Sequence, residues 1–310
     1  MKRCPISYES ILNDSLYSKN GLKLLSPQLE KLEPLGLSAE EQRQEAISRA
    51  GKMSIQGVQT KLSAQLKVKE GYFKIVDQQG QYILKTPSVH YPELPENEAL
   101  TMSLAAMMGI EVPVHGLLYA KDNSMTYFVK RFDRTGQHKK LALEDFSQLS
   151  GKSRDTKYQS SMEQVVDIIT KYCSFPKIEL IKLFKLTLFN YLTGNEDMHL
   201  KNFSIITKDQ KNYLSPAYDL VNTTIIIRES KEELALPLKG KKNNLTKKDL
   251  LHYFAVERLI LNQKIIDEVI NDFLQKIPSW FLLIEKSFLS VKMKENYKTL
   301  VEERKTKLFN

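Results

Sequence analysis

A buried helix, a polar loop and a short strand follow one another between residues 178 and 206, and this succession constrains the fold most. Residues 178–193 are apolar on nearly every face, which predicts a helix packed on all sides. The polar loop Asp197–Asn202 comes next, and the apolar residues 203–206 then read as a strand. Loops that a rigid core holds in place are where proteins present reactive side chains. The sequence therefore predicts a catalytic loop at this point of the chain.

Three side chains give this loop a chemical meaning. Asn202 lies five positions after Asp197, and a second carboxylate, Asp219, follows the strand. The first carboxylate can accept a hydrogen bond from an acceptor hydroxyl, while an amide and a later carboxylate can hold Mg²⁺ against nucleotide phosphates. An Asp-x-x-x-x-Asn pair occurs often by chance. Its place after a buried helix and before a strand makes phosphoryl transfer the favoured chemistry.

Length and charge leave several classes open. The 310 residues are enough for two lobes with a large core. Lysine and arginine exceed aspartate and glutamate by 46 − 37 = 9. This excess can attract anionic partners such as nucleotides, nucleic acid or an acidic protein face, but a lysine-rich composition explains it equally well.

Targeting and redox signals are weak. Cys4 and Cys173 are too few for a disulfide framework or a cysteine-based zinc site. The basic N-terminus has no apolar stretch behind it, so it does not read as a secretory signal. The most apolar run, residues 180–192, contains Lys182 and Lys185 and is too short to span a bilayer. We expect a soluble, cytoplasmic protein with no membrane partner.

Hydrophobic periodicity divides the chain into two halves. Residues 1–50 read as loops and a short helix, and the following segment reads as strands around one helix. The expected strands are 65–69, 72–76, 81–85, 114–119 and 125–131; strands 72–76 and 81–85 form a hairpin around the turn 77–80, and the helix 96–108 is capped by Gly109. From residue 132 onward the pattern is mainly helical, at 165–172, at 178–193 and repeatedly after 245.

These elements predict an α+β, bilobed, protein-kinase-like fold. Residues 1–131 form a small strand-rich N-lobe, and residues 132–310 form a mainly helical C-lobe with the catalytic and metal-binding loops. No Pro/Gly-rich linker separates the halves, so we expect lobes that share a cleft rather than independent domains.

The N-terminal half supplies residues that complement the loop. Gly57 stands before the first strand, where a glycine lets backbone N–H groups approach phosphates closely. Lys85 closes a strand and Glu98 follows on the next helix, an order in which protein kinases aim an ammonium group at the nucleotide phosphates. Each feature alone has an ordinary structural explanation. Their order along the chain is what favours a kinase.

Seven segments in order resemble the HipA-like serine/threonine kinases, the toxin components of bacterial toxin–antitoxin modules. They are Ser54–Lys61, Tyr82–Lys85, Glu96–Glu98, Val129–Arg134, Leu143–Gln148, Gly194–Asn202 and Pro216–Asp219. The Asp-x-His-x-x-Asn element is also similar to that of phosphatidylinositol kinases, which have a related fold.

The resemblance implies a role for each matching position. Asp197 would be the catalytic base, with Lys201 neutralising the transferred phosphoryl group. Asn202 and Asp219 would be the Mg²⁺ ligands, and Lys85 would contact the phosphates of ATP while paired with Glu98. The remaining nucleotide-binding positions would be Gln56, Gly57, Val58, Gln59, Thr60 and Lys61 in the phosphate loop, Lys130, Arg131 and Phe132 in the hinge, and His199, Leu200, Lys201, Asn202, Tyr218 and Asp219 in the pocket.

The resemblance also implies regulation and partners. Ser54 falls on the regulatory autophosphorylation serine of the family, where a phosphate would add nearly two negative charges beside ATP. About 50 residues precede the phosphate loop, too few for the N-terminal subdomain of longer members, so the chain looks like the short form often called HipT. The expected partners are an aminoacyl-tRNA synthetase as substrate, a small antitoxin subunit resembling the missing subdomain, and a DNA-binding helix-turn-helix antitoxin through which nucleic acid is contacted only indirectly.

Two other readings of the sequence stay open. One is a small-molecule or lipid kinase on a related fold, although the segment Leu143–Gln148 matches the protein-kinase toxins better. The other is a nucleic-acid-binding module that uses a lysine-rich run, formed by Lys239, Lys241, Lys242, Lys247 and Lys248. That run contains no interleaved aromatic residue and no known DNA-binding motif, so it reads first as a solvated loop.

Overall fold

The computed structural model describes the chain except for residues 1, 13, 51–58, 137–138, 152–157 and 228–230. The chain divides into two compact units. Unit 1 comprises residues 1–100, 113–138 and 285–290, and unit 2 comprises residues 101–112, 139–284 and 291–310.

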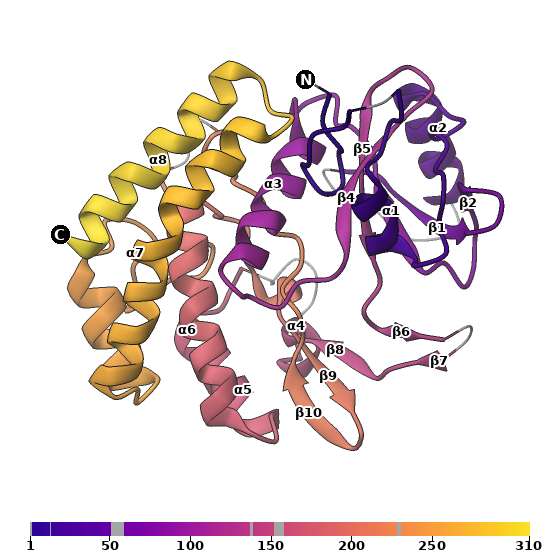
Figure 1. Cartoon of the computed structure of the whole chain (residues 1–310). Coiled ribbons are helices and arrows are strands. Elements are labelled where there is room, and N and C mark those ends of the chain that lie inside the picture. The colour runs from indigo at the N-terminus through magenta and orange to yellow at the C-terminus, as the bar shows by residue number, and fades with distance from the viewer. Residues whose placement is uncertain (1, 13, 51–58, 137–138, 152–157, 228–230) are drawn as a thin grey trace. The chain divides into compact units, whose positions relative to one another are not determined.

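Unit 1 is built on a five-stranded antiparallel sheet (Figure 1). Its strand order is β2-β1-β3-β5-β4, with β1 (Lys61–Lys67), β2 (Tyr72–Ile75), β3 (Tyr82–Lys85), β4 (His115–Tyr119) and β5 (Met125–Lys130). The central strands β3 and β5 pair Leu84 with Phe128 and Lys85 with Tyr127. The pattern of apolar and polar residues located all five strands to within a few positions.

The predicted hairpin between residues 72–76 and 81–85 is wrong. Strands β2 and β3 do not pair with each other, because β1 lies between them and pairs with both. The backbone N–H groups of Val76 and Gln81 instead donate to the carbonyls of Ser63 and Ala64 on β1. A four-residue connection suggested a local turn, but β2 forms its hairpin with the preceding strand β1, and β3 pairs with the other edge of β1.

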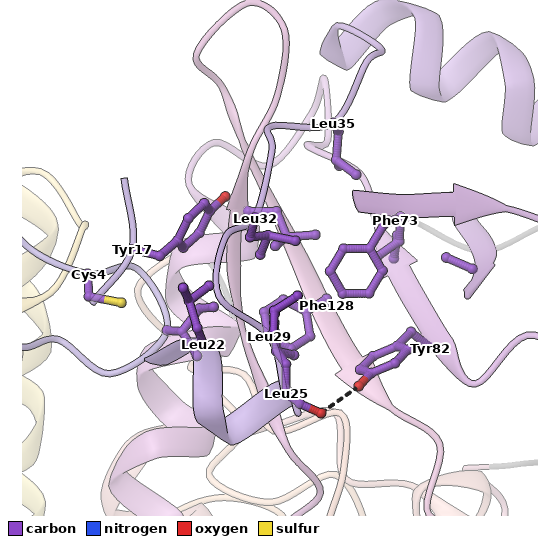
Figure 2. Close-up of a cluster of buried hydrophobic side chains, with 14 of the residues drawn as sticks. Cys4, Tyr17, Leu22, Leu25, Leu29, Leu32, Leu35, Phe73, Tyr82 and Phe128 are labelled. Carbon is purple, nitrogen blue, oxygen red and sulfur yellow. Dashed lines mark hydrogen bonds between the residues drawn. The ribbon is translucent and has the colours of Figure 1, made fainter. Parts of the chain in front are cut away.

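The first 50 residues contain two helices where one was expected. They are α1 (Lys19–Leu25), which Ser18 caps by accepting from the backbone N–H of Gly21, and α2 (Ala39–Ala50). Leucines from this segment pack with the sheet in one buried cluster around Phe73, Tyr82 and Phe128 (Figure 2). The leucines labelled in the figure are Leu22, Leu25, Leu29, Leu32 and Leu35. This N-terminal segment is therefore part of the core of unit 1.

Helix α3 (Leu94–Met107) confirms the helix that was predicted after the strands. The predicted cap is confirmed as well, because Gly109 has φ +72° and its N–H donates to the carbonyl of Ala106. A left-handed residue at this place is how many helices end, and glycine adopts it without a steric penalty.

Unit 2 is mainly helical, as the sequence indicated. Its main helices are α5 (Met162–Tyr172), α6 (Pro176–Thr193), the π-helical segment η2 (Lys248–Arg258), α7 (Gln263–Lys286) and α8 (Val291–Phe309). Helix α6 is the predicted buried helix, and Pro176 opens it in the first turn, where a missing N–H costs nothing. The long helices α7 and α8 contact each other through the rings of Phe273 and Phe309.

Unit 2 also carries a small sheet that the sequence indicated only in part. Strand β9 (Ser204–Lys208) is the predicted strand after the polar loop, and it lies between β10 (Lys211–Leu214) and β8 (Leu143–Asp145) (Figure 1). Asp145 then caps the short helix α4 (Phe146–Leu149) in a capping box with Gln148. The two-residue strand β7 (Lys139–Lys140) also lies in unit 2, whereas β6 (Arg134–Thr135) belongs to unit 1.

Within the described residues, none of the helices combines the length and the apolar character that crossing a bilayer requires. The lobe boundary expected at residue 131 stays a prediction, because the two compact units do not coincide with it.

Candidate functional site

Unit 1 contains a buried ion pair at the predicted position. The ammonium group of Lys85 at the end of β3 bonds to Oε1 of Glu98 on α3, and both side chains are almost wholly buried. The ammonium also lies 5.4 Å from the ring centre of Tyr127 on β5. The strand and the helix thus bring together the two residues that their order in the sequence singled out. Burial and the ion pair with Glu98 restrict the orientation of the Lys85 ammonium group.

The chain that enters β1 runs beside Lys85. Gln59 donates from Nε2 to the carbonyl of Thr86 over 2.9 Å, and the N–H of Thr86 donates to the carbonyl of Thr60. In the register of β1 and β3, Lys61 is the residue opposite Lys85. The predicted phosphate-loop residues Gln56, Gly57 and Val58, and the predicted autophosphorylation site Ser54, lie outside the described residues.

The predicted hinge begins at Lys130, the last residue of β5. Lys130 is exposed, while Arg131 and Phe132 are partly buried. The guanidinium group of Arg131 donates to both carboxylate oxygens of Asp133, over 3.0 and 2.9 Å. This bidentate pair stiffens the chain just after the sheet.

In unit 2, the predicted catalytic loop begins where α6 ends. Gly194 closes the helix with φ +71°, and its carbonyl accepts from the N–H groups of Thr223 and Thr224. A Cβ at Gly194 would lie 2.5 Å from Leu300 and 2.7 Å from the Thr224 hydroxyl. Only glycine fits this corner, so the start of the loop is fixed by both conformation and space.

Hydrogen bonds within the loop hold its backbone. Oδ1 of Asn195 accepts from the N–H of Asp197 over 3.2 Å, while its Nδ2 donates to Asn190 on α6. The carbonyl of Asp197 accepts both from the N–H of His199 and from Nδ2 of Asn202, over 2.8 and 2.9 Å. The five-residue spacing of Asp197 and Asn202 therefore closes a turn in which the amide holds the backbone of the carboxylate residue.

The side chains of the loop differ in exposure. The side chain of Asp197 is half exposed, whereas His199, Leu200 and Asn202 are buried. Nε2 of His199 lies 3.9 Å from Oδ1 of Asp197. The hydroxyl of Tyr158 donates to the same carboxylate oxygen. The carboxylate of Asp197 thus reaches solvent from a loop that is mostly buried, as a base that must meet an acceptor hydroxyl requires.

Tyr218 ties the second acidic position to the loop. Its hydroxyl donates to the carbonyl of Lys201 over 2.8 Å and accepts from the hydroxyl of Ser204 over 2.6 Å. Burial raises the pKa of Tyr218 above its ordinary range, so the phenol stays neutral and keeps its donor. The next residue, Asp219, has φ +55°, an uncommon conformation for a residue with a side chain. Such a backbone at a predicted metal ligand is typical of functional sites.

The donor set of these residues fits Mg²⁺ better than a transition metal. The described part of the chain has no group of three or more His, Cys, Asp or Glu side chains that could hold a metal ion. Mg²⁺ usually takes one or two protein oxygens and completes its shell with water and phosphate oxygens. Nδ2 of Asn202 donates to the Asp197 carbonyl, which leaves the side-chain oxygen of Asn202 as the atom that could bind Mg²⁺.

Two residues that the sequence did not single out support the loop. Arg304 on α8 donates to the carbonyl of Tyr191 on α6, and its Nη2 lies 3.6 Å from Glu196. The other is Tyr158, 39 positions before Asp197. Neither has a local signal, since a basic residue on a polar helix and a tyrosine in a polar segment look like ordinary surface residues.

Comparison with known proteins identifies several relatives by sequence. A relative from Haemophilus influenzae is 35% identical over 187 residues, which cover 56% of this chain and 53% of that protein. A serine/threonine-protein kinase toxin HipA from Shewanella oneidensis is 28% identical over 206 residues, which cover 60% of this chain and 47% of that protein. The chain spans about half the length of the curated relatives it matches.

A solved structure confirms the fold. The match is to a complex of HipA, HipB and operator DNA from the toxin–antitoxin system of Shewanella oneidensis. The TM-score is 0.70 at 22% sequence identity, and the match covers 89% of this chain and 72% of that chain. The predicted kinase-like α+β fold, with a strand-rich part and a helical C-terminal part, is therefore confirmed.

The family follows from a match over most of the sequence. The model of the HipA-like C-terminal domain matches residues 53–281. This range contains Lys85, Glu98, the loop 194–202 and Asp219, and it covers well over half of the sequence. The chain belongs to the family of the HipA-like C-terminal domain.

Proposed function

We propose that this protein is an ATP- and Mg²⁺-dependent kinase that transfers a phosphoryl group to serine or threonine hydroxyls of proteins. One observation carries the proposal: the carboxylate of Asp197 is half exposed in a loop where His199, Leu200 and Asn202 are buried. Family membership supports the same chemistry, and the relative named as a serine/threonine-protein kinase toxin supports the acceptor type.

The proposed reaction assigns one role to each residue of the loop. Asp197 orients the acceptor hydroxyl and takes its proton, while the acceptor oxygen bonds to the γ-phosphorus and the bond from that phosphorus to ADP breaks. Asn202 and Asp219 would hold Mg²⁺, which when bound would neutralise charge on the phosphates. Lys201 stabilises the transferred group, and Tyr218 keeps the Asp219 segment against the loop.

The residues of unit 1 complete the proposal. Lys85, directed by Glu98, contacts the nucleotide phosphates. Residues 56–61 form the phosphate loop, and Lys130, Arg131 and Phe132 form the adenine hinge. We retain residues 1–131 and 132–310 as the two functional lobes. Autophosphorylation at Ser54 would block nucleotide binding by charge repulsion.

We further propose that the kinase acts as the toxin of a toxin–antitoxin system and phosphorylates an aminoacyl-tRNA synthetase. The structural neighbour that is solved with HipB and operator DNA supports a DNA-binding antitoxin as partner. That a small antitoxin subunit binds as well stays a prediction.

The isosteric change Asp197→Asn tests the proposed base. The amide keeps the shape of the side chain and its acceptor oxygen, so the fold and ATP binding should persist. Transfer of label from γ-labelled ATP to lysate proteins should fall about 10²–10⁴-fold. Asp267→Asn on α7 is the matched control, because Asp267 is an exposed carboxylate that accepts from Gln263. Equal activity of Asp197→Asn and wild type would contradict the assignment.

The two competing functions make different predictions. A lipid kinase would label phosphoinositide vesicles rather than lysate proteins in the same assay. A nucleic-acid-binding module would bind free DNA with strong salt dependence. The lysine-rich run gives little support to DNA binding, because two of its lysines are already in ion pairs. Lys241 pairs with Asp249, and Lys242 pairs with Glu232.

A further inference from the structure

We propose that Tyr158 is a positioning residue that fixes the carboxylate of Asp197 for phosphoryl transfer. The inference rests on the proposed function of Asp197 as the base and adds a role for a residue that no sequence motif marked.

The contact itself is specific. The hydroxyl of Tyr158 donates to Oδ1 of Asp197, although 39 residues separate the two in sequence. Among the described residues, no hydrogen bond reaches Oδ2 of the same carboxylate. Since half of the Asp197 side chain is exposed, Oδ2 is the oxygen left to meet an acceptor hydroxyl. One oxygen is thus anchored and the other is presented.

Tyr158 is itself held from two sides. Its ring packs edge-on against the ring of His199, with centroids 5.0 Å apart and planes at 80°. The ammonium group of Lys242 lies 5.8 Å from the Tyr158 ring centre, and Lys242 is in turn paired with Glu232 over 3.2 Å. Edge-on aromatic and cation–π contacts each restrict a ring at a modest energetic gain. A side chain fixed in this way is suited to position another group.

The protonation state of the phenol agrees with this role. Burial, together with the neighbouring Asp197 carboxylate, raises the pKa of Tyr158 above its ordinary range. The phenol therefore remains a neutral donor and does not compete with Asp197 as a base.

The backbone and the side chain of Asp197 are then held by different partners. Asn195 and Asn202 fix the backbone of Asp197 through the bonds described above. Without the Tyr158 hydroxyl, the backbone would stay in place while the carboxylate could rotate. A small error in the direction of a base lowers the rate of the chemical step more than it lowers substrate binding.

The test is a kinetic comparison of wild type with Tyr158→Phe, in which only the hydroxyl is removed. Transfer from γ-labelled ATP to lysate proteins is measured over a range of ATP concentrations. We expect kcat to fall about tenfold or more, as the loss of a hydrogen bond to a charged group implies, with KM for ATP unchanged.

Tyr253→Phe is the matched control. Tyr253 also donates its hydroxyl to a carboxylate, Glu163, over 3.1 Å, and also lies under a lysine, Lys239, at 5.0 Å. It has no contact with the loop among the described residues, so its removal should leave both kcat and KM near wild type.

Each other outcome overturns the inference. Unchanged kinetics of Tyr158→Phe would show that the hydroxyl does not position the base. Higher activity of Tyr158→Phe would show that the Tyr158 hydroxyl inhibits the reaction. Phosphotyrosine at position 158 in wild type, but not in Asp197→Asn, would show that Tyr158 is a phosphoryl acceptor. An inactive wild type would contradict the proposed function, whereas a crystal structure without the Tyr158–Asp197 contact would contradict this inference alone.

Discussion

The Lys85–Glu98 pair of unit 1 and the Asp197 loop of unit 2 are built in opposite ways. Lys85 and Glu98 stand on a strand and a helix, and both are almost wholly buried. Asp197 stands on an irregular loop with half of its side chain exposed, held by Asn195, Asn202 and Tyr158.

The difference shows which interactions fix the side-chain positions in each region. Regular elements fix Lys85 and Glu98 through backbone pairing, and the ion pair then depends on having both partners. The loop has no regular ladder to rely on, so individual side-chain bonds and one glycine corner determine its shape. Unit 1 should therefore respond to lost charge, and the loop to lost space or lost hydrogen bonds.

Breaking the ion pair should have the largest effect on stability. Glu98→Gln leaves the buried ammonium of Lys85 without its carboxylate, which should lower the free energy of unfolding by about 3–5 kcal/mol. Urea unfolding of the purified chain measures this loss.

The double variant Lys85→Met with Glu98→Leu sharpens the same test. Replacing both charges by apolar groups should recover most of the stability, because no unpaired charge remains. Kinase activity should stay absent, since the proposed phosphate contact is gone. Full stability of Glu98→Gln alone would contradict the view that the pair is buried and interdependent.

Filling the corner of the loop should have an intermediate effect. Gly194→Ala adds a Cβ 2.5 Å from Leu300 to a residue at φ +71°, and should cost about 2–4 kcal/mol from strain and overpacking together. Gly240→Ala is the control, because Gly240 has a similar φ of +74° but nothing within 4 Å of the added Cβ. Thermal unfolding should rank Gly194→Ala clearly below Gly240→Ala; equal losses would mean that space at the corner is not limiting.

The last prediction concerns pH and the carboxylate two residues before Glu98. Burial raises the pKa of Glu96 to about 7 from the ordinary 4.5. The native state therefore holds a proton that the unfolded chain has already released, so the free energy of unfolding should fall as pH rises from about 4.5 to about 7. Glu96→Gln should flatten this decline, measured by urea unfolding across that range. A slope unchanged from wild type would show that Glu96 titrates normally.

The sequence was sufficient for features set by nearby residues. Periodicity located α3 and α6, and the left-handed glycine after α3 was predicted from its position alone. The order of Lys85, Glu98, Asp197, Asn202 and Asp219 indicated the kinase family that the comparisons confirmed. Local pattern carries such information because helices, caps and family motifs are short-range in sequence.

The sequence was insufficient where distant segments compete for the same partner. The turn at residues 77–80 suggested a hairpin, but β1 pairs with both of its arms. The second helix in the first 50 residues was missed because its residues are mostly polar.

By itself, then, the sequence determined the family of the chain and the residues that we propose to carry the chemistry, since their types and spacing match what phosphoryl transfer requires. Only the tertiary structure decided what holds them. Tyr158 and Arg304 contact the loop region from 39 and more than 100 positions away, and hydrogen bonds across such separations leave no periodic trace in a single sequence. The proposed base was singled out by its neighbours along the chain, whereas the orientation of its side chain depends on neighbours in space.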